Sequence, residues 1–161
     1  MPCLLLAVGL SVAAHKSAAD TTLSRDDLGF LLAKAAQRWN ERLAARFAAA
    51  GYADVRPSYG SVLLPLFEED GLRMGELARR ARLSKQTITS MVGRLERNSL
   101  VERRADPSDA RASLIFLTTR SRRFAPLASA TLRELEALTR SRLGPQLTAD
   151  TRKALRLLME L

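Results

Sequence analysis

The chain has 161 residues, of which 47% are hydrophobic and 27% are charged, and its formal net charge is +9. This composition fits one folded domain, or a small domain with oligomerisation helices, and excludes a disordered tail. A single cysteine (Cys3) and a single histidine (His15) exclude a disulfide framework, a cysteine-based zinc cluster and a catalytic triad built on histidine. We therefore expect no cofactor, no metal and no enzymatic activity, and a reducing, cytoplasmic location.

An apolar run occupies residues 3–14 at the N-terminus. It is too short to span a bilayer, and no Lys or Arg precedes it, as one would in a secretion signal. Two interpretations stay open: an arm that packs on a partner subunit, or an extension upstream of the folded domain, which we favour. Cys3 lies in this run without a basic neighbour, which favours an inert thiol over a redox sensor.

A long amphipathic helix is expected from Ser24 to about Ala50, with Ser24 as its N-cap, Asp27 in its first turn and Gly51 at its end. Apolar residues recur at spacings of three and four: Leu28, Leu31, Leu32, Ala35, Ala36, Trp39, Leu43 and Phe47. So long a stripe suggests packing against a partner chain. A second helix opens at residues 57–60, and Pro65 should kink or shorten it.

The next stretch indicates two helices joined by a tight turn. A short helix over residues 75–81 precedes Arg82-Leu83, and Ser84 then caps a longer helix from Lys85 to about Asn98. Its core side carries Ile88, Met91, Val92 and Leu95. The opposite side is small, polar and cationic, without an acid, and consists of Gln86, Ser90, Gly93 and Arg97, flanked by Thr87, Thr89 and Arg94. Such a face suits a helix that lies in the major groove of DNA.

The charge of the chain is concentrated around these helices. Residues 73–123 hold 13 of the 26 Lys and Arg residues but only 5 of the 17 Asp and Glu residues. A positive surplus on one supersecondary unit is typical of a surface that binds a polyanion.

Two strands are expected after the longer helix, over residues 100–104 and 112–117, joined by a turn-rich loop over residues 105–111. A hairpin behind such a helix is a wing, and an arginine on its loop can enter the narrow minor groove. A helix over residues 119–143 follows, either continuous or restarted at Pro126. Gly144-Pro145 should break it, and residues 147–150 should cap a last helix that carries Ala154, Leu155, Leu158, Met159 and Leu161 as apolar residues.

Several of these segments resemble the MarR family of winged helix-turn-helix transcriptional regulators, from about Leu28 to the C-terminus. The matching pieces are Glu76-Leu77-Ala78, Leu83-Ser84, Arg94-Leu95-Glu96, Leu100-Val101-Glu102-Arg103, Asp106-Pro107-Ser108-Asp109-Ala110-Arg111 and Leu117-Thr118. The sequence departs from the family at Ser99 and Ser121, where glycine is usual, and at Ala110, where arginine is common. If position 99 needs a positive φ, the serine there carries a conformational cost.

The resemblance implies a mainly α fold with a small β-hairpin wing, in which N- and C-terminal helices form a homodimer. The expected segments are an N-terminal extension (1–22), a dimerisation helix (23–56), the winged helix-turn-helix region (57–119) and C-terminal dimerisation helices (120–161). In the family, the aspartate matching Asp109 orients the arginine matching Arg111, which enters the minor groove. The residues expected at DNA are Ser84, Lys85, Gln86, Thr87, Thr89, Ser90, Arg94, Arg97, Arg103, Asp109 and Arg111.

The resemblance further implies a repressor that is released from its operator by a small, often aromatic ligand. The candidate ligand residues are Trp39, Arg42, Tyr59 and Leu63, although plain packing explains Trp39 and Leu63 better. Two other functions stay open: a thiol-based sensor that uses Cys3, and a membrane-associated basic protein anchored by residues 3–14. The charge distribution argues against the membrane, because the cations lie far from that run.

Overall fold

The computed structural model describes residues 24–160, which fall into two units, residues 24–35 and residues 36–160. The predictions for Cys3, His15, the apolar run and the N-terminal extension lie outside the described residues. No helix among residues 24–160 is long and apolar enough to cross a membrane.

The first helix, α1, spans Leu28–Ala49 and begins later than the sequence predicts. Asp27 is its N-cap: its Oδ1 accepts from the backbone N–H groups of Gly29 (2.8 Å) and Phe30 (3.2 Å). Ser24 instead accepts from the N–H of Asp26 in the turn before the helix. The prediction that Ser24 caps this helix was therefore wrong, because the Asp27 carboxylate accepts from two backbone amides of the first turn. Gly51 follows the helix with a φ of +86°, as expected.

The second helix combines a 3-10 turn, η1 (Pro57–Tyr59), with α2 (Gly60–Glu68). Pro65 lies inside α2, which continues for three more residues and ends within one turn of it. Gly71 then turns the chain with a φ of +74°, and a Cβ at this position would lie 2.7 Å from a ring carbon of Phe116. This position therefore requires glycine for both its conformation and its space.

The two helices of the helix-turn-helix are α3 (Met74–Ala81) and α4 (Lys85–Arg97). Arg82 forms the turn between them in the left-handed conformation, with a φ of 52°. Ser84 caps α4 by accepting from the N–H of Thr87 at 3.1 Å. The expected turn and cap are confirmed here, and the bounds of both helices lie within one residue of those predicted.

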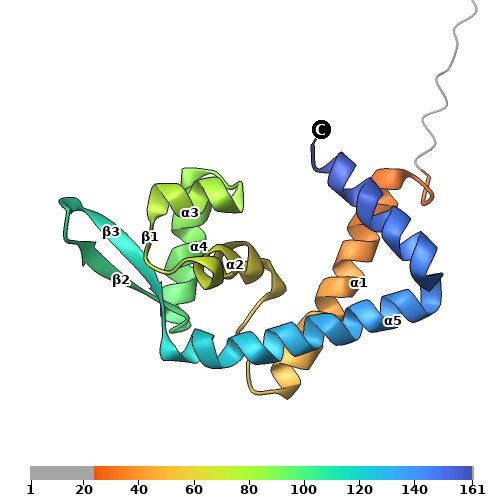
Figure 1. Ribbon diagram of the computed structural model, residues 1–161, viewed down its shortest axis with the longest axis horizontal. Coiled ribbons are helices and arrows are strands. Elements are labelled where there is room, and N and C mark those ends of the chain that lie inside the picture. Colours follow the sequence, from red (N-terminus) through yellow and green to blue (C-terminus); the bar gives the residue numbers. More distant parts are fainter. Residues whose placement is uncertain (1–23, 161) are drawn as a thin grey trace, which may run out of the picture. The chain divides into compact units, whose positions relative to one another are not determined.

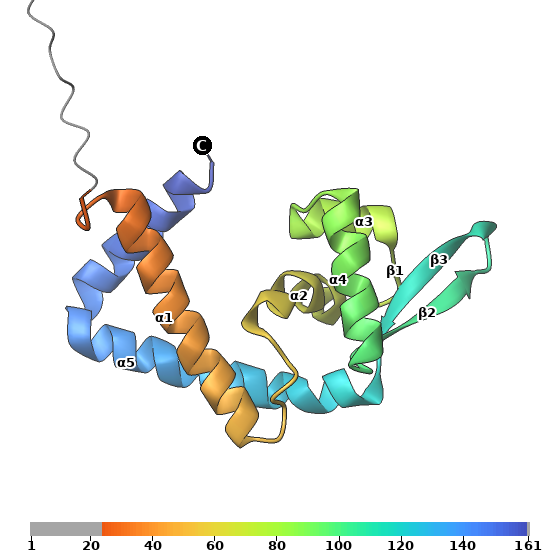
Figure 2. The ribbon, with the colours of Figure 1, turned by 180° about the vertical axis from the view of Figure 1, so that it is seen from behind.

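Three antiparallel strands form one sheet in the order β1-β3-β2, from β1 (Leu72–Arg73), β2 (Val101–Asp106) and β3 (Asp109–Leu117). The sequence analysis missed β1, because two residues show no alternation. It also placed a loop over residues 105–111, whereas the strands continue to Asp106 and resume at Asp109. The wing is therefore a long hairpin with a two-residue turn, and it extends away from the helices (Figures 1 and 2).

The last element, α5, runs through Thr119–Leu158, and Thr118 caps it by accepting from the N–H of Ser121. The backbone departs from helical angles at Gly144 (φ 75°, ψ 166°), so two helices meet there, as predicted. The helix passes through Pro126 without a break, which excludes a restart at that residue. The final helix resumes directly at Pro145, before the predicted cap, because proline fits the first position of a helix.

One hydrophobic core lies within residues 36–160, and it contains buried side chains from α1, α2, α3, α4, the sheet and α5. Val62, Leu77, Ile88, Val92 and Leu95 are fully buried in it. By contrast, the C-terminal part of α5 and the residue after it expose a set of large apolar side chains: Leu138, Leu143, Leu147, Leu155, Leu157 and Met159.

Candidate nucleic-acid interface

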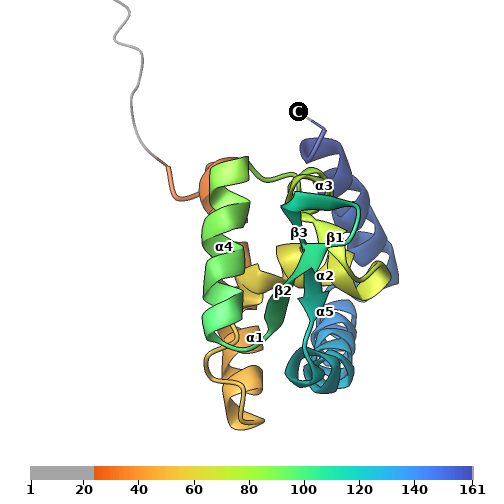
Figure 3. The ribbon, with the colours of Figure 1, turned by 90° about the vertical axis from the view of Figure 1, so that its left-hand side faces the viewer.

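Helix α4 has one buried side and one exposed side. Ile88, Val92 and Leu95 are fully buried, and Met91 packs against the same core. The exposed residues are those that the sequence analysis placed at DNA: Lys85, Gln86, Thr87, Thr89, Ser90, Arg94 and Arg97. The side without an acid is therefore open to solvent and available to a partner. Figure 3 views this helix beside the hairpin.

Hydrogen bonds within the first turn fix part of this surface. The Ser84 and Thr87 hydroxyls lie 2.8 Å apart, and Thr89 Oγ1 donates to the carbonyl of Lys85 at 2.7 Å. These bonds hold the short side chains in one rotamer, which lowers the entropic cost of an interaction with a base edge.

The turn of the wing is held by Asp106, whose side chain is buried. Its Oδ1 accepts from the N–H (2.8 Å) and the hydroxyl (2.7 Å) of Ser108. Its Oδ2 accepts from Arg73 Nε at 2.6 Å, and Arg73 Nη2 also donates to Ser108 Oγ at 2.9 Å. The bonds from Ser108, aided by the Arg73 guanidinium, lower the pKa of the Asp106 carboxyl. Asp106 is thus a turn and ion-pair residue.

Near the tip of the wing, Asp109 Oδ1 accepts from the backbone N–H of Arg111 at 3.0 Å. This bond goes to the backbone of Arg111, and it fixes the local strand geometry. The Arg111 side chain is exposed. Its orientation by Asp109 toward a minor groove stays a prediction.

Two arginines of β2 already have partners within the chain. Arg103 Nε donates to Glu96 Oε1 at 2.9 Å, which joins β2 to α4. Arg104 pairs with Glu102, and its guanidinium lies 4.4 Å from the centre of the Phe116 ring. Arg103 therefore lies beside α4, and an interaction with DNA would share its guanidinium with Glu96.

A polar cleft lies at the C-terminal end of α4. Its lining comes from that end of the helix and from the segment before α2: Ala53, Asp54, Arg56, Tyr59, Arg94, Arg97 and Asn98. Sequence reasoning missed Arg56 here and Arg73 at the wing, because neither stands in a recognisable motif. Only the fold brings the loop at residue 56 to the end of α4.

The four candidate ligand residues do not form one site. Leu63 lines an apolar cavity, Trp39 lines a second pocket against α5, and buried Tyr59 lines the polar cleft. The exposed Arg42 belongs to none of these three lining sets. The sequence placed the four on neighbouring helices but could not show that their side chains diverge.

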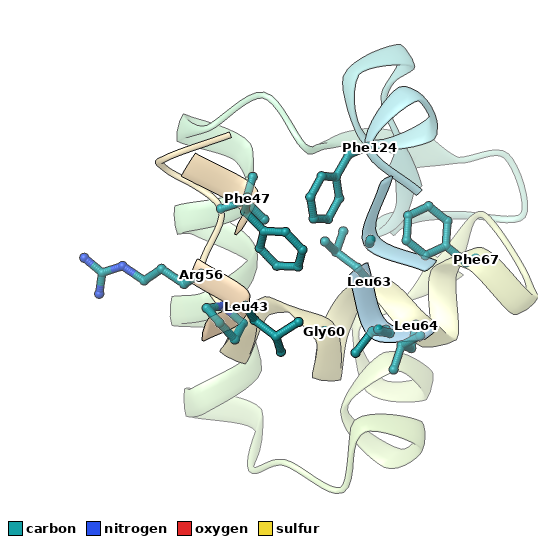
Figure 4. A pocket seen from close by; sticks show the side chains of 12 residues that line it. Leu43, Phe47, Arg56, Gly60, Leu63, Leu64, Phe67 and Phe124 are labelled. Atoms are coloured by element: carbon teal, nitrogen blue, oxygen red, sulfur yellow. The ribbon is translucent and has the colours of Figure 1, made fainter. Parts of the chain in front are cut away.

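The apolar cavity has a volume of about 160 Å³ and lies among α1, α2 and α5. Leu43, Phe47, Leu63 and Phe124 project into it, whereas the Arg56 side chain points away (Figure 4). The other lining residues are Val55, Pro57, Gly60, Leu64, Phe67, Ala128 and Leu132.

The family model for the MarR family matches residues 57–113, which cover the helix-turn-helix and most of the wing. A probable transcriptional regulator from Pseudomonas aeruginosa, whose crystal structure is known, is 30% identical. The alignment covers 83% of this chain and 97% of that chain, with a TM-score of 0.68. This chain belongs to the MarR family. The family and its mainly helical fold with a small β wing are therefore confirmed, and so is the expectation that this transcription regulator is not an enzyme.

A curated relative, the HTH-type transcriptional regulator TtmR of Methylorubrum extorquens, is 43% identical over 61 residues. The match covers 38% of this MarR-family chain and 31% of TtmR, so it spans about a third of that relative.

Two other solved structures share the fold at lower identity. The PcaV transcriptional regulator from Streptomyces coelicolor, in complex with its natural ligand, is 21% identical, with 86% and 96% of the two chains covered and a TM-score of 0.71. The S. aureus MepR–DNA complex is 19% identical, with 83% and 96% covered and a TM-score of 0.70.

Proposed function

We propose that this MarR-family regulator binds an operator in double-stranded DNA through α4 and the wing. The observation that carries the proposal is the exposed, acid-free side of α4, set beside a hairpin whose turn is held by Asp106. Gln86, Thr87 and Ser90 lie at the N-terminal half of α4 and contact base edges in the major groove. Arg111 on the wing enters the adjacent minor groove, where the negative potential is enhanced. MepR, which shares the fold, was solved as a complex with DNA.

We also propose that the working form is a homodimer that represses transcription. At the end of α5, Leu157 is 58% exposed and Met159, which follows the helix, is 67% exposed, besides several other leucines. Large apolar side chains gathered on one helix mark a protein–protein interface. A dimer places two copies of α4 about 34 Å apart, one turn of DNA, and so reads an inverted repeat.

Selection of bound sequences from a random pool of duplex DNA tests this function. We expect an inverted repeat whose half-sites lie about one helical turn apart. Sedimentation of the free protein should give a dimer, and a Leu155→Glu variant should give monomers that bind DNA more weakly. A pool without enrichment, or a chain that ignores duplex DNA in dilute buffer, would contradict the proposal.

The apolar cavity supports a ligand response of this regulator. A cavity of about 160 Å³ is close to the ~150 Å³ that suffices for a benzene ring in an engineered protein core. Phe47 and Phe124 offer aromatic edges, and the lining has almost no polar atoms, so an uncharged aromatic compound fits better than a carboxylate. PcaV, of the same fold, was solved with its natural ligand.

Titration of phenol and of salicylate into the DNA-bound protein tests the ligand response. We expect phenol to weaken DNA binding at a lower concentration than salicylate, because burial of the carboxylate would cost free energy. Leu63→Phe, which fills the cavity, should abolish the response while DNA binding persists. Unchanged affinity with both compounds would count against a ligand-released repressor.

A further inference from the structure

The polar cleft at the C-terminal end of α4 holds an unusual concentration of arginines. Arg94 and Arg97 come from the last turn of the helix, and Arg56 comes from the segment before α2. The Tyr59 hydroxyl accepts a hydrogen bond from Asn98 Nδ2 at 3.5 Å, so its own proton is available to a ligand. Three cations and a hydroxyl donor therefore line one solvent-accessible hollow.

The only carboxylate that lines this cleft is Asp54, which already has a partner. Arg120 Nη1 and Nη2 donate to its two oxygens at 2.7 and 2.6 Å. These bonds from Arg120 lower the pKa of Asp54, so the carboxylate stays ionised and its charge is offset by α5. It does not neutralise Arg56, Arg94 or Arg97.

The three cleft arginines differ from the arginines around them. Arg73, Arg103, Arg120 and Arg122 each form an ion pair with a carboxylate. Among the residues that the structure describes, Arg56, Arg94 and Arg97 form no such ion pair. The stem of Arg56 borders the apolar cavity while its charged end points away from it (Figure 4), as long basic side chains do at an apolar boundary. Like charges that lie together without carboxylate partners of their own are suited to an external anion.

The position of the cleft indicates which kind of anion binds there. Arg97 lies three turns from Gln86 on the same side of α4, so the cleft continues the surface that faces DNA. A helix of 13 residues is about 20 Å long, whereas the major groove is about 12 Å wide. When the first turns of α4 reach the base edges, the last turn must therefore lie at the sugar-phosphate backbone beside the groove.

We propose that the cleft formed by Arg56, Tyr59, Arg94 and Arg97 binds a phosphate of the DNA backbone at the edge of the operator. The inference rests on the proposed function and adds Arg56 and Tyr59 to the DNA-binding residues. Arginine forks match phosphate oxygens with two hydrogen bonds, and the Tyr59 hydroxyl supplies a further donor. These interactions fix the register of α4 without reading sequence.

The salt dependence of DNA binding tests the proposal. Arg56→Gln keeps a polar side chain but removes the charge, whereas Arg56→Lys keeps the charge. Arg140→Gln removes a charge from an exposed position of α5 and is the matched control. Binding of a duplex that carries the selected site is measured from 0.1 to 1 M salt. Arg56→Gln should reduce the slope of log K against log salt by about 0.9 for each cleft engaged. Over this tenfold range of salt, the wild type should therefore lose about eight-fold more affinity than the variant for each such cleft. Arg56→Lys should retain most of the slope.

The source of the phosphate is settled by a second titration, of inorganic phosphate into the free protein at constant ionic strength. Weak, millimolar binding supports the DNA backbone as the source. Tight phosphate binding that Arg56→Gln abolishes, with an unchanged DNA slope, would overturn the proposal in favour of a free-anion site. Equal slopes for Arg56→Gln and Arg140→Gln would overturn it as well. In either of these results the wild-type protein still binds DNA, so the proposed function stands. A wild-type chain that does not bind DNA would contradict both the proposed function and the phosphate site.

Discussion

Arg73 Nε donates to Asp106 Oδ2 at 2.6 Å, across the 33 residues that separate β1 from the end of β2. This bond joins the strand before the helix-turn-helix to the turn of the wing. Because Arg73 also donates to Ser108, one guanidinium holds Asp106, which precedes the hairpin turn, and Ser108, which lies within it. The wing is thus fixed relative to α3, which begins one residue after Arg73.

Arg73→Gln should therefore weaken DNA binding, although Arg73 is not among the residues that we propose to contact DNA. Loss of the guanidinium leaves the buried Asp106 with fewer donors and lets the hairpin move, so Arg111 spends less time in the groove. We expect Arg73→Gln and Arg111→Ala each to lower affinity, and the double variant to be little worse than Arg111→Ala alone. Fluorescence anisotropy with labelled operator measures the cycle, and additive losses would show that Arg73 acts independently of the wing.

Ser99 at the end of α4 should be replaceable by glycine with a gain in stability. Its φ is 54°, and the N–H of Leu100 donates to the carbonyl of Leu95 at 2.8 Å around it. This is the hydrogen-bond pattern of a helix end whose central residue is left-handed. A side chain in that conformation costs about 1–2 kcal/mol. Ser99→Gly should raise the free energy of unfolding by about 0.5–1 kcal/mol, after the greater freedom of the unfolded glycine is subtracted.

Urea denaturation measures the effect of Ser99→Gly. Ser129→Gly, in the middle of α5, is the matched control, and it should lower the free energy of unfolding by a few tenths to about 1 kcal/mol. A loss of stability in both variants would mean that the left-handed conformation at Ser99 is not retained in solution.

The sequence predicted those parts of this protein whose signals are local. Hydrophobic spacing located α3, α4 and the buried Ile88, and the pattern around Ser84 identified the cap. The sequence could not distinguish Asp27 from Ser24 as the N-cap of α1, since both residue types favour that position. Three features depend on residues far apart in the sequence, so no periodic pattern predicts them: the strand at Leu72, the Arg73–Asp106 bond and the cleft at Arg56.

The ion pair of Asp54 with Arg120 should make stability depend on pH in the acid range. Hydrogen bonds from Arg120 lower the pKa of Asp54 below its ordinary 3.8 in the folded state. A depressed folded pKa contributes stability above the unfolded pKa, and that contribution is lost as the pH falls through the folded value. Asp54→Asn should therefore be less stable than wild type at pH 6, with the difference shrinking below pH 4.

Urea midpoints between pH 2.5 and 7 measure this difference. Asp150→Asn is the control, since Asp150 is exposed and, within residues 24–160, its oxygens accept hydrogen bonds only from Gln146. A difference between Asp54→Asn and wild type that stays constant across the range would show that the pair makes no pH-dependent contribution.

Gln86 and Arg111 should affect DNA recognition in different ways. Gln86 lies exposed in the first turn of α4, so Gln86→Ala should change the preferred base at one position of each half-site by about 1–3 kcal/mol. Arg111→Ala should weaken binding to all sequences and reduce the salt slope by about one unit for each phosphate charge that the arginine no longer neutralises. Competition between operator variants separates the two. If Gln86→Ala retained the wild-type preference at every base pair, α4 would not be the reading element.

Phe124 should be the aromatic residue whose loss costs most stability. Its ring contacts Phe47 edge to face, with centroids 4.9 Å apart, and lies 5.0 Å from the Tyr52 ring. Phe124 is 3% exposed, whereas Phe67 on the same cavity is 36% exposed. Phe124→Ala should lower the free energy of unfolding by about 3–5 kcal/mol, because it removes buried packing and enlarges an existing cavity. Phe67→Ala should cost clearly less, because part of its surface already meets water. Urea denaturation measures both, and equal losses would mean that Phe67 is covered in solution by a partner chain.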